Sequence, residues 1–165
     1  MTRLVHISLL LLAALCLGMA ACNDGSCYEN GSSLPLATFY INGSQQTIPG
    51  ITIMGIGAPG DSMIALNESL KEAYLPLRAN VGTTSYLVGR QVTIDTIDVL
   101  LDDTLTLTYQ AVPYFHSSEC GAMYNFEVKD MQCTFHYIDS VDLITTTITN
   151  SHTPALRIYF HDLTQ

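Results

Sequence analysis

The stretch Thr104-Leu105-Thr106-Leu107-Thr108-Tyr109 alternates a threonine with a large apolar or aromatic side chain at every second position. Successive side chains of a β-strand point to opposite faces, so this spacing puts Leu105, Leu107 and Tyr109 on one face. β-branched and aromatic residues also favour extended backbone. The stretch therefore predicts a strand with one buried face, and the chain on either side is interpreted from it.

Strand-like runs recur on both sides of this stretch, separated by turn residues. They cover residues 34–41, 48–56 and 62–66 before it, and 124–128 and 156–160 after it. The pair Asn42-Gly43 closes the first run and is typical of a tight hairpin turn. Many short strands without long helical patterns between them predict an all-β fold, an antiparallel β-sandwich that is immunoglobulin-like or related.

One segment departs from the strand pattern. Apolar side chains there recur at intervals of three and four, at Leu66, Leu70, Ala73, Tyr74 and Leu77. Asn67 could cap a helix at the start of this segment, and Pro76 would end it. The spacing predicts one short helix near 67–75, and an irregular crossover remains the alternative.

The N-terminus has the order of an export signal. Arg3 supplies a positive charge, and residues 9–17 form an apolar run too short to span a bilayer as a helix. Met19-Ala20-Ala21-Cys22 follows and resembles a bacterial lipobox, in which Cys22 receives diacylglycerol before the signal is removed. The alternative is a plain secretory signal, cleaved after Ala20 or Ala21.

The sequence thus divides into a lipoprotein signal peptide (1–21), a polar tether (22–33) and a single β-sandwich domain (34–165). A lipid on Cys22 would anchor the chain to a membrane without spanning it. Of six basic and 15 acidic side chains only Arg3 is lost with the signal, so the mature charge would be 5 − 15 = −10. Such a surface repels nucleic acid and anionic lipid, and we expect no nucleic-acid partner.

Five cysteines are present, of which Cys16 would leave with the signal and Cys22 would carry the lipid. The remaining Cys27, Cys120 and Cys133 allow one disulfide and one spare thiol in an oxidising compartment. Cys27 and Cys120 lie beside turn residues at strand ends, whereas Cys133 has apolar and aromatic neighbours. We therefore predict a Cys27–Cys120 disulfide and a buried Cys133 thiol, and the other two pairings remain open.

No known catalytic motif is found in the sequence. The histidines are scattered, and no Cys-x-x-Cys or His-x-x-x-His pair suggests a metal centre. Asp95, Asp98, Asp102 and Asp103 are close enough in sequence to bind calcium but lack the EF-hand spacing. We expect them to be surface acids at strand ends. The sequence predicts a protein that is not an enzyme and needs no cofactor or metal.

Four triplets share the order Asp, hydroxyl residue, apolar residue, at 61–63, 95–97, 103–105 and 139–141. This order is similar to the O-glycosylation motif of exported Bacteroidota proteins. It makes four hydroxyl residues candidate modification sites, namely Ser62, Thr96, Thr104 and Ser140. The structural interpretation is equally open, because Asp favours turns and a hydroxyl-apolar pair commonly begins a strand.

Short motifs follow the lipobox and the Cys27 position in a set order along the mature chain. They are the Leu34-Pro35-Leu36 to Tyr40 run, Asp61-Ser62, Leu75-Pro76-Leu77, Asp103-Thr104-Leu105-Thr106, Cys120-Gly121 and Ile138-Asp139-Ser140-Val141. Together they resemble an uncharacterised family of small Bacteroidota lipoproteins. The resemblance implies an outer-membrane setting, with an outer-membrane β-barrel protein as a partner, and it assigns no catalytic residue.

Two functions follow from these expectations. The first is a non-enzymatic, lipid-anchored envelope protein that acts as an interaction or accessory module of the outer membrane, facing the periplasm or, alternatively, the cell surface. The second is a ligand- or carbohydrate-binding module facing periplasm or cell surface. The second function predicts an exposed row of tyrosines, for which Tyr74, Tyr86 and Tyr114 are the candidates.

Overall fold

The computed structural model describes residues 33–59, 62–94, 96–117 and 120–162. These residues form strands joined by turns and contain no helix, so none of them belongs to a helix able to cross a membrane. The strands are β1 (Leu36–Ile41), β2 (Ser44–Gln45), β3 (Ile48–Ile56), β4 (Met63–Leu70), β5 (Glu72–Tyr74), β6 (Thr83–Ile94), β7 (Ile97–Ser117), β8 (Gly121–Cys133), β9 (Ile138–Leu143), β10 (Thr147–Ile148) and β11 (Pro154–Phe160). The all-β fold predicted from the sequence is confirmed.

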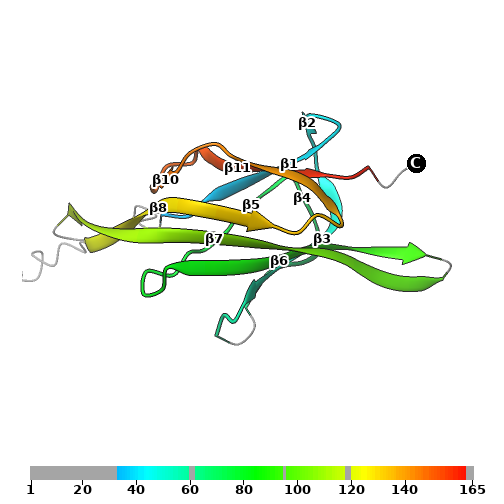
Figure 1. The fold of residues 1–165 in the computed structure, drawn as a ribbon, viewed down its shortest axis with the longest axis horizontal. Helices are drawn as coiled ribbons and strands as arrows, with labels where there is room; N and C mark the ends of the chain where they lie inside the picture. Colours follow the sequence, from blue (N-terminus) through cyan, green and yellow to red (C-terminus); the bar gives the residue numbers. More distant parts are fainter. Residues whose placement is uncertain (1–32, 60–61, 95, 118–119, 163–165) are drawn as a thin grey trace, which may run out of the picture.

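The strands form two sheets that pack together as a sandwich (Figure 1). One sheet has the order β2-β1-β11-β9, with β5 also paired to β1, and the other has the order β10-β8-β7-β6-β3-β4. Neighbouring strands run antiparallel except β1 and β11, which run parallel. The predicted antiparallel sandwich is therefore confirmed, with one parallel pair between the first and last strands.

The core lies between the sheets and follows the alternation of the 104–109 stretch. Leu105, Leu107 and Tyr109 of β7 are all buried, as their two-residue spacing predicts. The facing sheet contributes the apolar side chains of β1 and β11, among them Phe39 and Phe160, whose rings meet edge to face at 5.6 Å. Aromatic pairs in this geometry add to the stabilisation from buried area.

The Asn42-Gly43 pair forms the predicted hairpin turn between β1 and β2. Asn42 has φ 51° and Gly43 has φ 74°, and Ile41 pairs with Ser44 across the turn. Both residues tolerate this left-handed backbone, which matches the twist of the flanking strands.

The helix predicted near 67–75 is wrong, because β4 and β5 occupy this segment and are joined at Lys71. Pairing between β3 and β4 shifts register at three places. Asn67, at one of these irregular points, has φ 51°, and its N–H donates to Thr52 Oγ1 at 3.1 Å. Each shift breaks the two-residue period, so the apolar side chains fall at helical intervals without sharing a face. Leu66 of the apparent apolar face is 62% exposed.

β7 is the longest strand, with 21 residues, and it forms a hairpin at each of its ends. It pairs with β6 near its start and with β8 near its end. The tips of the two hairpins therefore lie at opposite ends of the molecule (Figure 1).

Candidate functional site

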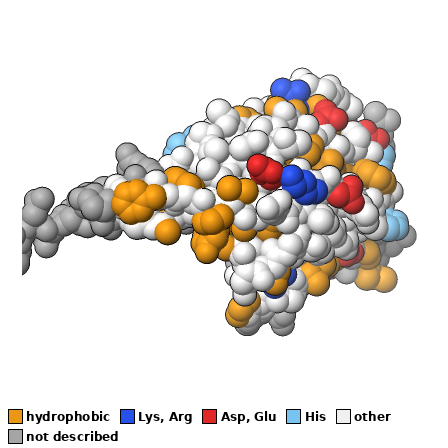
Figure 2. All heavy atoms as spheres, turned by 60° about the vertical axis from the view of Figure 1, so that its left-hand side comes forward, with side chains coloured by type: hydrophobic (Ala, Val, Ile, Leu, Met, Phe, Trp, Pro, Cys, Tyr) orange, Lys and Arg blue, Asp and Glu red, His pale blue; other side chains and the backbone are white. Residues whose placement is uncertain are grey.

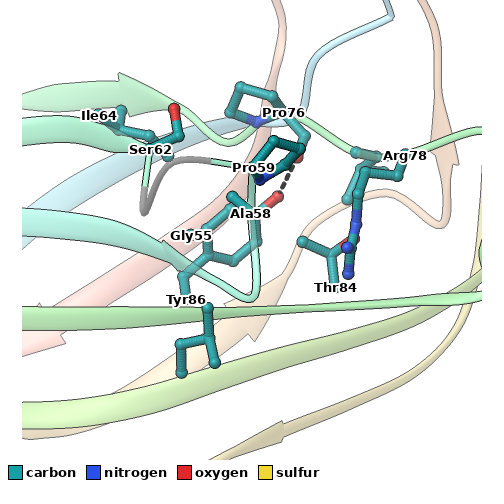
Figure 3. A pocket seen from close by; sticks show the side chains of 11 residues that line it. Gly55, Ala58, Pro59, Ser62, Ile64, Pro76, Arg78, Thr84 and Tyr86 are labelled. Carbon is teal, nitrogen blue, oxygen red and sulfur yellow. Dashed lines mark hydrogen bonds between the residues drawn. The ribbon is translucent and has the colours of Figure 1, made fainter.

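A hollow of about 330 Å³ opens between the β3–β4 connection, the 75–78 segment and β6 (Figure 3). Its apolar wall includes Ile56, Pro59, Ile64, Pro76 and Leu77. Its polar groups come from Ser62, Arg78, Thr84 and Tyr86. A concave, mostly apolar surface with a few polar groups is typical of small-ligand sites, whose volumes begin at roughly 300 Å³.

Arg78 is fixed at this hollow by a hydrogen-bond network around Tyr109. The Arg78 N–H donates to the Tyr109 hydroxyl at 3.0 Å, and that hydroxyl donates back to the Arg78 carbonyl at 3.0 Å. Thr84 Oγ1 lies 2.6 Å from the same hydroxyl. The guanidinium donates to the carbonyls of Gly57 and Thr83 at 3.4 and 3.3 Å. Its Nε is buried and finds no hydrogen-bond partner in the part of the chain that the structure describes. The guanidinium as a whole carries a positive charge at the edge of the hollow, which would attract an anionic group of a ligand.

Tyr86 closes the inner side of the hollow. Its side chain is buried, and its hydroxyl donates to the Pro76 carbonyl at 2.5 Å. Burial and the neighbouring Tyr109 raise the pKa of Tyr86, against the opposite effect of Arg78, so the phenol stays neutral. Tyr74 and Tyr114 are half-buried. These three tyrosines therefore do not form the exposed row that a sugar-stacking site requires.

A second polar cluster surrounds Asp103 of β7, which is 1% exposed. Its Oδ1 accepts hydrogen bonds from Thr134 Oγ1 at 2.7 Å and from the His136 N–H at 2.8 Å, and His136 Nδ1 also lies 2.8 Å away. Its Oδ2 accepts from the N–H groups of Tyr137 and Ile138, each at 2.7 Å. The expectation that Asp103 is a surface acid is wrong, because these donors replace the water that a buried carboxylate would lose.

The donors decide the charge state of this carboxylate. Burial by itself would raise the pKa of Asp103, but hydrogen bonds from Ile138, Thr134, His136 and Tyr137 outweigh burial and lower that pKa below its ordinary value. Asp103 is therefore ionised at neutral pH. Both of its oxygens are engaged by the segment that leaves β8 for the other sheet, so the carboxylate stabilises that crossover.

The described histidines and acids are not grouped into a metal site. No group of three or more His, Cys, Asp or Glu side chains suited to a metal ion occurs among the described residues. Of the four acids considered for calcium, Asp98 accepts a hydrogen bond from Thr93 at 2.8 Å. Both oxygens of Asp103 already accept hydrogen bonds from the chain. Asp95 lies outside the described residues.

The four candidate glycosylation sites differ in environment. Ser62 precedes β4 and Thr96 lies between β6 and β7, and both side chains are exposed. Thr104 is half-buried in β7. Ser140 is half-buried in β9, and its hydroxyl donates to Asp139 at 3.4 Å. Modification of any of the four stays a prediction, and at Thr104 the preceding Asp103 has a structural role of its own.

The two cysteines that the structure describes, Cys133 and Cys120, differ in chemical state. Cys133 has a free thiol and is half-buried, and its Sγ donates to the Thr134 carbonyl at 3.0 Å. Burial and the nearby Asp103 raise the pKa of Cys133 to about 11, so the thiol is poorly nucleophilic at neutral pH. Cys120 is disulfide-bonded, and Cys133 is not its partner. Cys22 and Cys27 lie outside the described residues, so the Cys27–Cys120 pairing stays a prediction.

A family model described as a family of unknown function, DUF6452, matches residues 50–160. The chain belongs to this family. The DUF6452 span runs from within β3 to the last residue of β11, so it includes both the Arg78 hollow and the Asp103 cluster. Searches of curated proteins and of solved structures found no match. Membership in DUF6452 agrees with an uncharacterised family, and it assigns no activity.

Sequence reasoning missed Arg78 and assigned Asp103 to the surface. Arg78 lies in an irregular segment and belongs to no motif, so only the fold shows that it meets Tyr109 and β6. Asp103 did leave a signal. It occupies the same alternating face as Leu105 and Leu107, where an acid must be either exposed or hydrogen-bonded.

Proposed function

We propose that the protein is a non-enzymatic, lipid-anchored envelope protein, held at the outer membrane through Cys22, whose domain works as an interaction or accessory module. The observation that supports the proposal most directly is that few residues separate Cys22, the predicted lipid anchor, from the first buried residue of the domain. Ser33, which is 33 − 22 = 11 residues after Cys22, is already buried, and its hydroxyl donates to Asn125 Oδ1 at 3.0 Å. Eleven residues span at most roughly 40 Å, so a lipid on Cys22 would hold the domain close to the bilayer.

The Asp103 cluster supports the non-enzymatic part of the proposal. An acid beside a histidine and a thiol has the composition of a catalytic site. Here both carboxylate oxygens accept backbone N–H groups, and the side chain of His136 is 74% exposed. The nearby Cys133 has a raised pKa. Asp103, His136 and Cys133 therefore have surroundings that stabilise the fold, and the thiol is not activated as a nucleophile.

The outer edge of the larger sheet supports an interaction role. β4 ends this sheet, and its Met63 and Leu66 are 46% and 62% exposed. An open edge strand with apolar side chains is suited to contact with another protein. We propose an outer-membrane β-barrel protein as the partner, with the domain on the periplasmic side and the cell surface as the alternative.

Replacing the anchor residue tests this proposal. Cells producing the wild-type protein should retain it in the membrane fraction and release it only with detergent. Cys22→Ser should either appear in the soluble fraction or accumulate with its signal uncleaved. Cys133→Ser is the matched control and should fractionate like wild type. Wild-type behaviour of Cys22→Ser would refute the lipid anchor.

The hollow beside Arg78 favours a second candidate function, the binding of a small ligand with an apolar body and an anionic group. The positive charge of Arg78 and the apolar wall, which line the same hollow, are the observations that favour it. We propose an aliphatic carboxylate such as octanoate as the probe, because it combines both features.

Calorimetric titration of octanoate into the purified domain would measure this binding. Arg78→Met should weaken it about tenfold or more, since a charge-assisted hydrogen bond contributes roughly 1.5–3 kcal/mol. Arg157→Met makes the same change on the other sheet, where Arg157 lies 5.9 Å from the Tyr40 ring, and should leave the affinity unchanged. No heat of binding to the wild-type domain, or equal affinities for both variants, would rule the candidate out.

A further inference from the structure

One face of the β7–β8 hairpin is buried in the core at one end and becomes exposed to solvent toward the hairpin tip. Tyr109 and Phe126 on this face are buried, at 4% and 5% exposure. Farther along the hairpin, on the same face, Pro113 pairs with Tyr124, and Phe115 comes two residues after Pro113. Tyr124 is 44% exposed and Phe115 is 73% exposed, the highest exposure among the large apolar side chains of the described chain. This end of the hairpin therefore presents two exposed aromatic side chains, of which Phe115 is the more exposed.

The described chain begins beside this tip. Ser33 and Leu34 line a hollow of about 490 Å³ together with Ala122, Met123 and Tyr124 of the hairpin. The Ser33 hydroxyl also donates to Asn125 of β8. Figure 2, turned so that this end of the molecule comes forward, shows hydrophobic side chains gathered toward its left-hand end. The tether thus enters the fold at the end that carries the exposed aromatic residues.

Charge is sparse at the same end. Residues 111–126 include one formally charged residue, Glu119, besides His116. Charged residues begin again immediately afterwards, at Glu127, Lys129 and Asp130. In a mature chain with a net charge of −10, a segment with one acid in 16 residues lowers the electrostatic cost of approaching a lipid surface relative to the rest of the molecule. Aromatic side chains prefer the interfacial layer between headgroups and acyl chains.

We propose that the β7–β8 tip inserts Phe115 and Tyr124 into the interfacial layer of the bilayer that holds the lipid anchor. This inference rests on the proposed lipidation of Cys22. Ser33 follows Cys22 by 11 residues, which reach at most roughly 40 Å, so the tip stays within reach of that bilayer. In this orientation the β7–β8 end of the domain faces the bilayer. With 21 residues, β7 carries the opposite hairpin tip roughly 65 Å of strand length away from the membrane.

The absence of tryptophan from the chain allows a direct test. Phe115→Trp places a single fluorescent reporter at the tip. Phe135→Trp places one beyond the far end of β8, where Phe135 is 58% exposed, and serves as the matched control. Both sites are exposed, so both variants should fold. Lipidated, full-length mature protein would be reconstituted on phosphatidylcholine vesicles with either plain or brominated acyl chains.

On vesicles, we expect the emission of the Phe115→Trp reporter to shift to shorter wavelength and to be quenched by the brominated chains. The Phe135→Trp reporter should show neither effect. Co-sedimentation with vesicles is read first, because failure to sediment refutes the anchor and with it this inference. If the protein sediments but its reporter at 115 matches the control, the anchor stands and the inserted tip is refuted. A short-wavelength emission already present in soluble Cys22→Ser, without quenching on vesicles, would mean that the tether or a second copy covers the tip.

Discussion

Asp103 shows at the scale of one residue how this sandwich accommodates a charge inside its core. The carboxylate accepts three backbone N–H groups and one hydroxyl from residues 134–138, all within 2.8 Å. Hydrogen bonds to an ionised group are roughly twice as strong as neutral ones. This set of bonds fixes the path of the chain as it leaves β8 for β9 in the other sheet.

Replacing Asp103 should therefore be costly even when shape is kept. Asp103→Asn retains one acceptor oxygen but turns an amide NH₂ toward N–H donors, which leaves buried polar groups unpaired. We expect the free energy of unfolding in urea to fall by about 3 kcal/mol. Asp102→Asn, on the adjacent half-buried residue, is the control and should change it by less than about 0.5 kcal/mol. Equal effects of the two variants would contradict the structural role of Asp103.

The lowered pKa of Asp103 makes its contribution depend on pH. The folded-state pKa lies below the unfolded value of about 3.9. The contribution to stability is therefore complete above that unfolded value and is lost as the pH falls through the folded pKa. The difference in unfolding free energy between wild type and Asp103→Asn should shrink between pH 7 and pH 3. Urea titrations at several pH values would measure it, and a constant difference would contradict the assignment.

Sequence reasoning reached these residues only in part. The alternation of 104–109 predicted which face of β7 is buried, but it could not supply the donors that make an acid at 103 acceptable there. Those donors lie 31 to 35 residues away and meet Asp103 only once the sheets have packed. Arg78 was missed for the same reason, because its partners Tyr109 and Thr83 lie on separate strands.

At the scale of elements, the clearest failure concerns β4. Its first half was predicted as a strand within 62–66, but its second half and β5 were interpreted as a helix, because three register shifts against β3 remove the two-residue period on which strand prediction depends. Regular pairing left a readable pattern. β3 was predicted with its observed bounds, and β11 extends only two residues before the predicted run. No strand was predicted at β6, β9 or β10, because β9 and β10 are short and the apolar residues of β6 do not follow a clean two-residue alternation.

The β6–β7 hairpin has a close approach at Gly89, which pairs with Asp102. A Cβ at this position would lie 2.9 Å from Asp102 Cβ and 2.9 Å from the Leu101 carbonyl oxygen. Gly89→Ala must push β7 away beside Asp103, so we expect a loss of roughly 1–3 kcal/mol in thermal unfolding experiments. Gly82→Ala is the control, because its nearest neighbour would be the Tyr109 carbonyl at an ordinary 3.4 Å. An unchanged melting temperature for Gly89→Ala would show that the strands can separate at low cost.

At the scale of the whole molecule, the predicted Cys27–Cys120 disulfide would tie the tether to the β8 end of the sandwich. It would close a loop of 120 − 27 − 1 = 92 residues, which in the chain-entropy model stabilises the fold by about 4–5 kcal/mol. Reduction should lower the melting temperature clearly, and Cys133→Ala should leave the bridge intact. Peptide mapping without reduction identifies the pair. A bridge from Cys120 to any cysteine other than Cys27 would overturn the assignment.

The parallel pairing of β1 with β11 affects the order in which the chain can reach its native state. Leu36 pairs with Pro154, so the first strand waits for a partner that is synthesised 154 − 36 = 118 residues later. Contacts this distant in sequence form slowly. Until the last seven-residue strand arrives, β1 and β9 are without the neighbour that joins them. A chain that ends before residue 154 therefore leaves an open edge on β1 and leaves β9 without the strand it pairs with, so we expect C-terminal truncation to favour aggregation through unpaired strand edges.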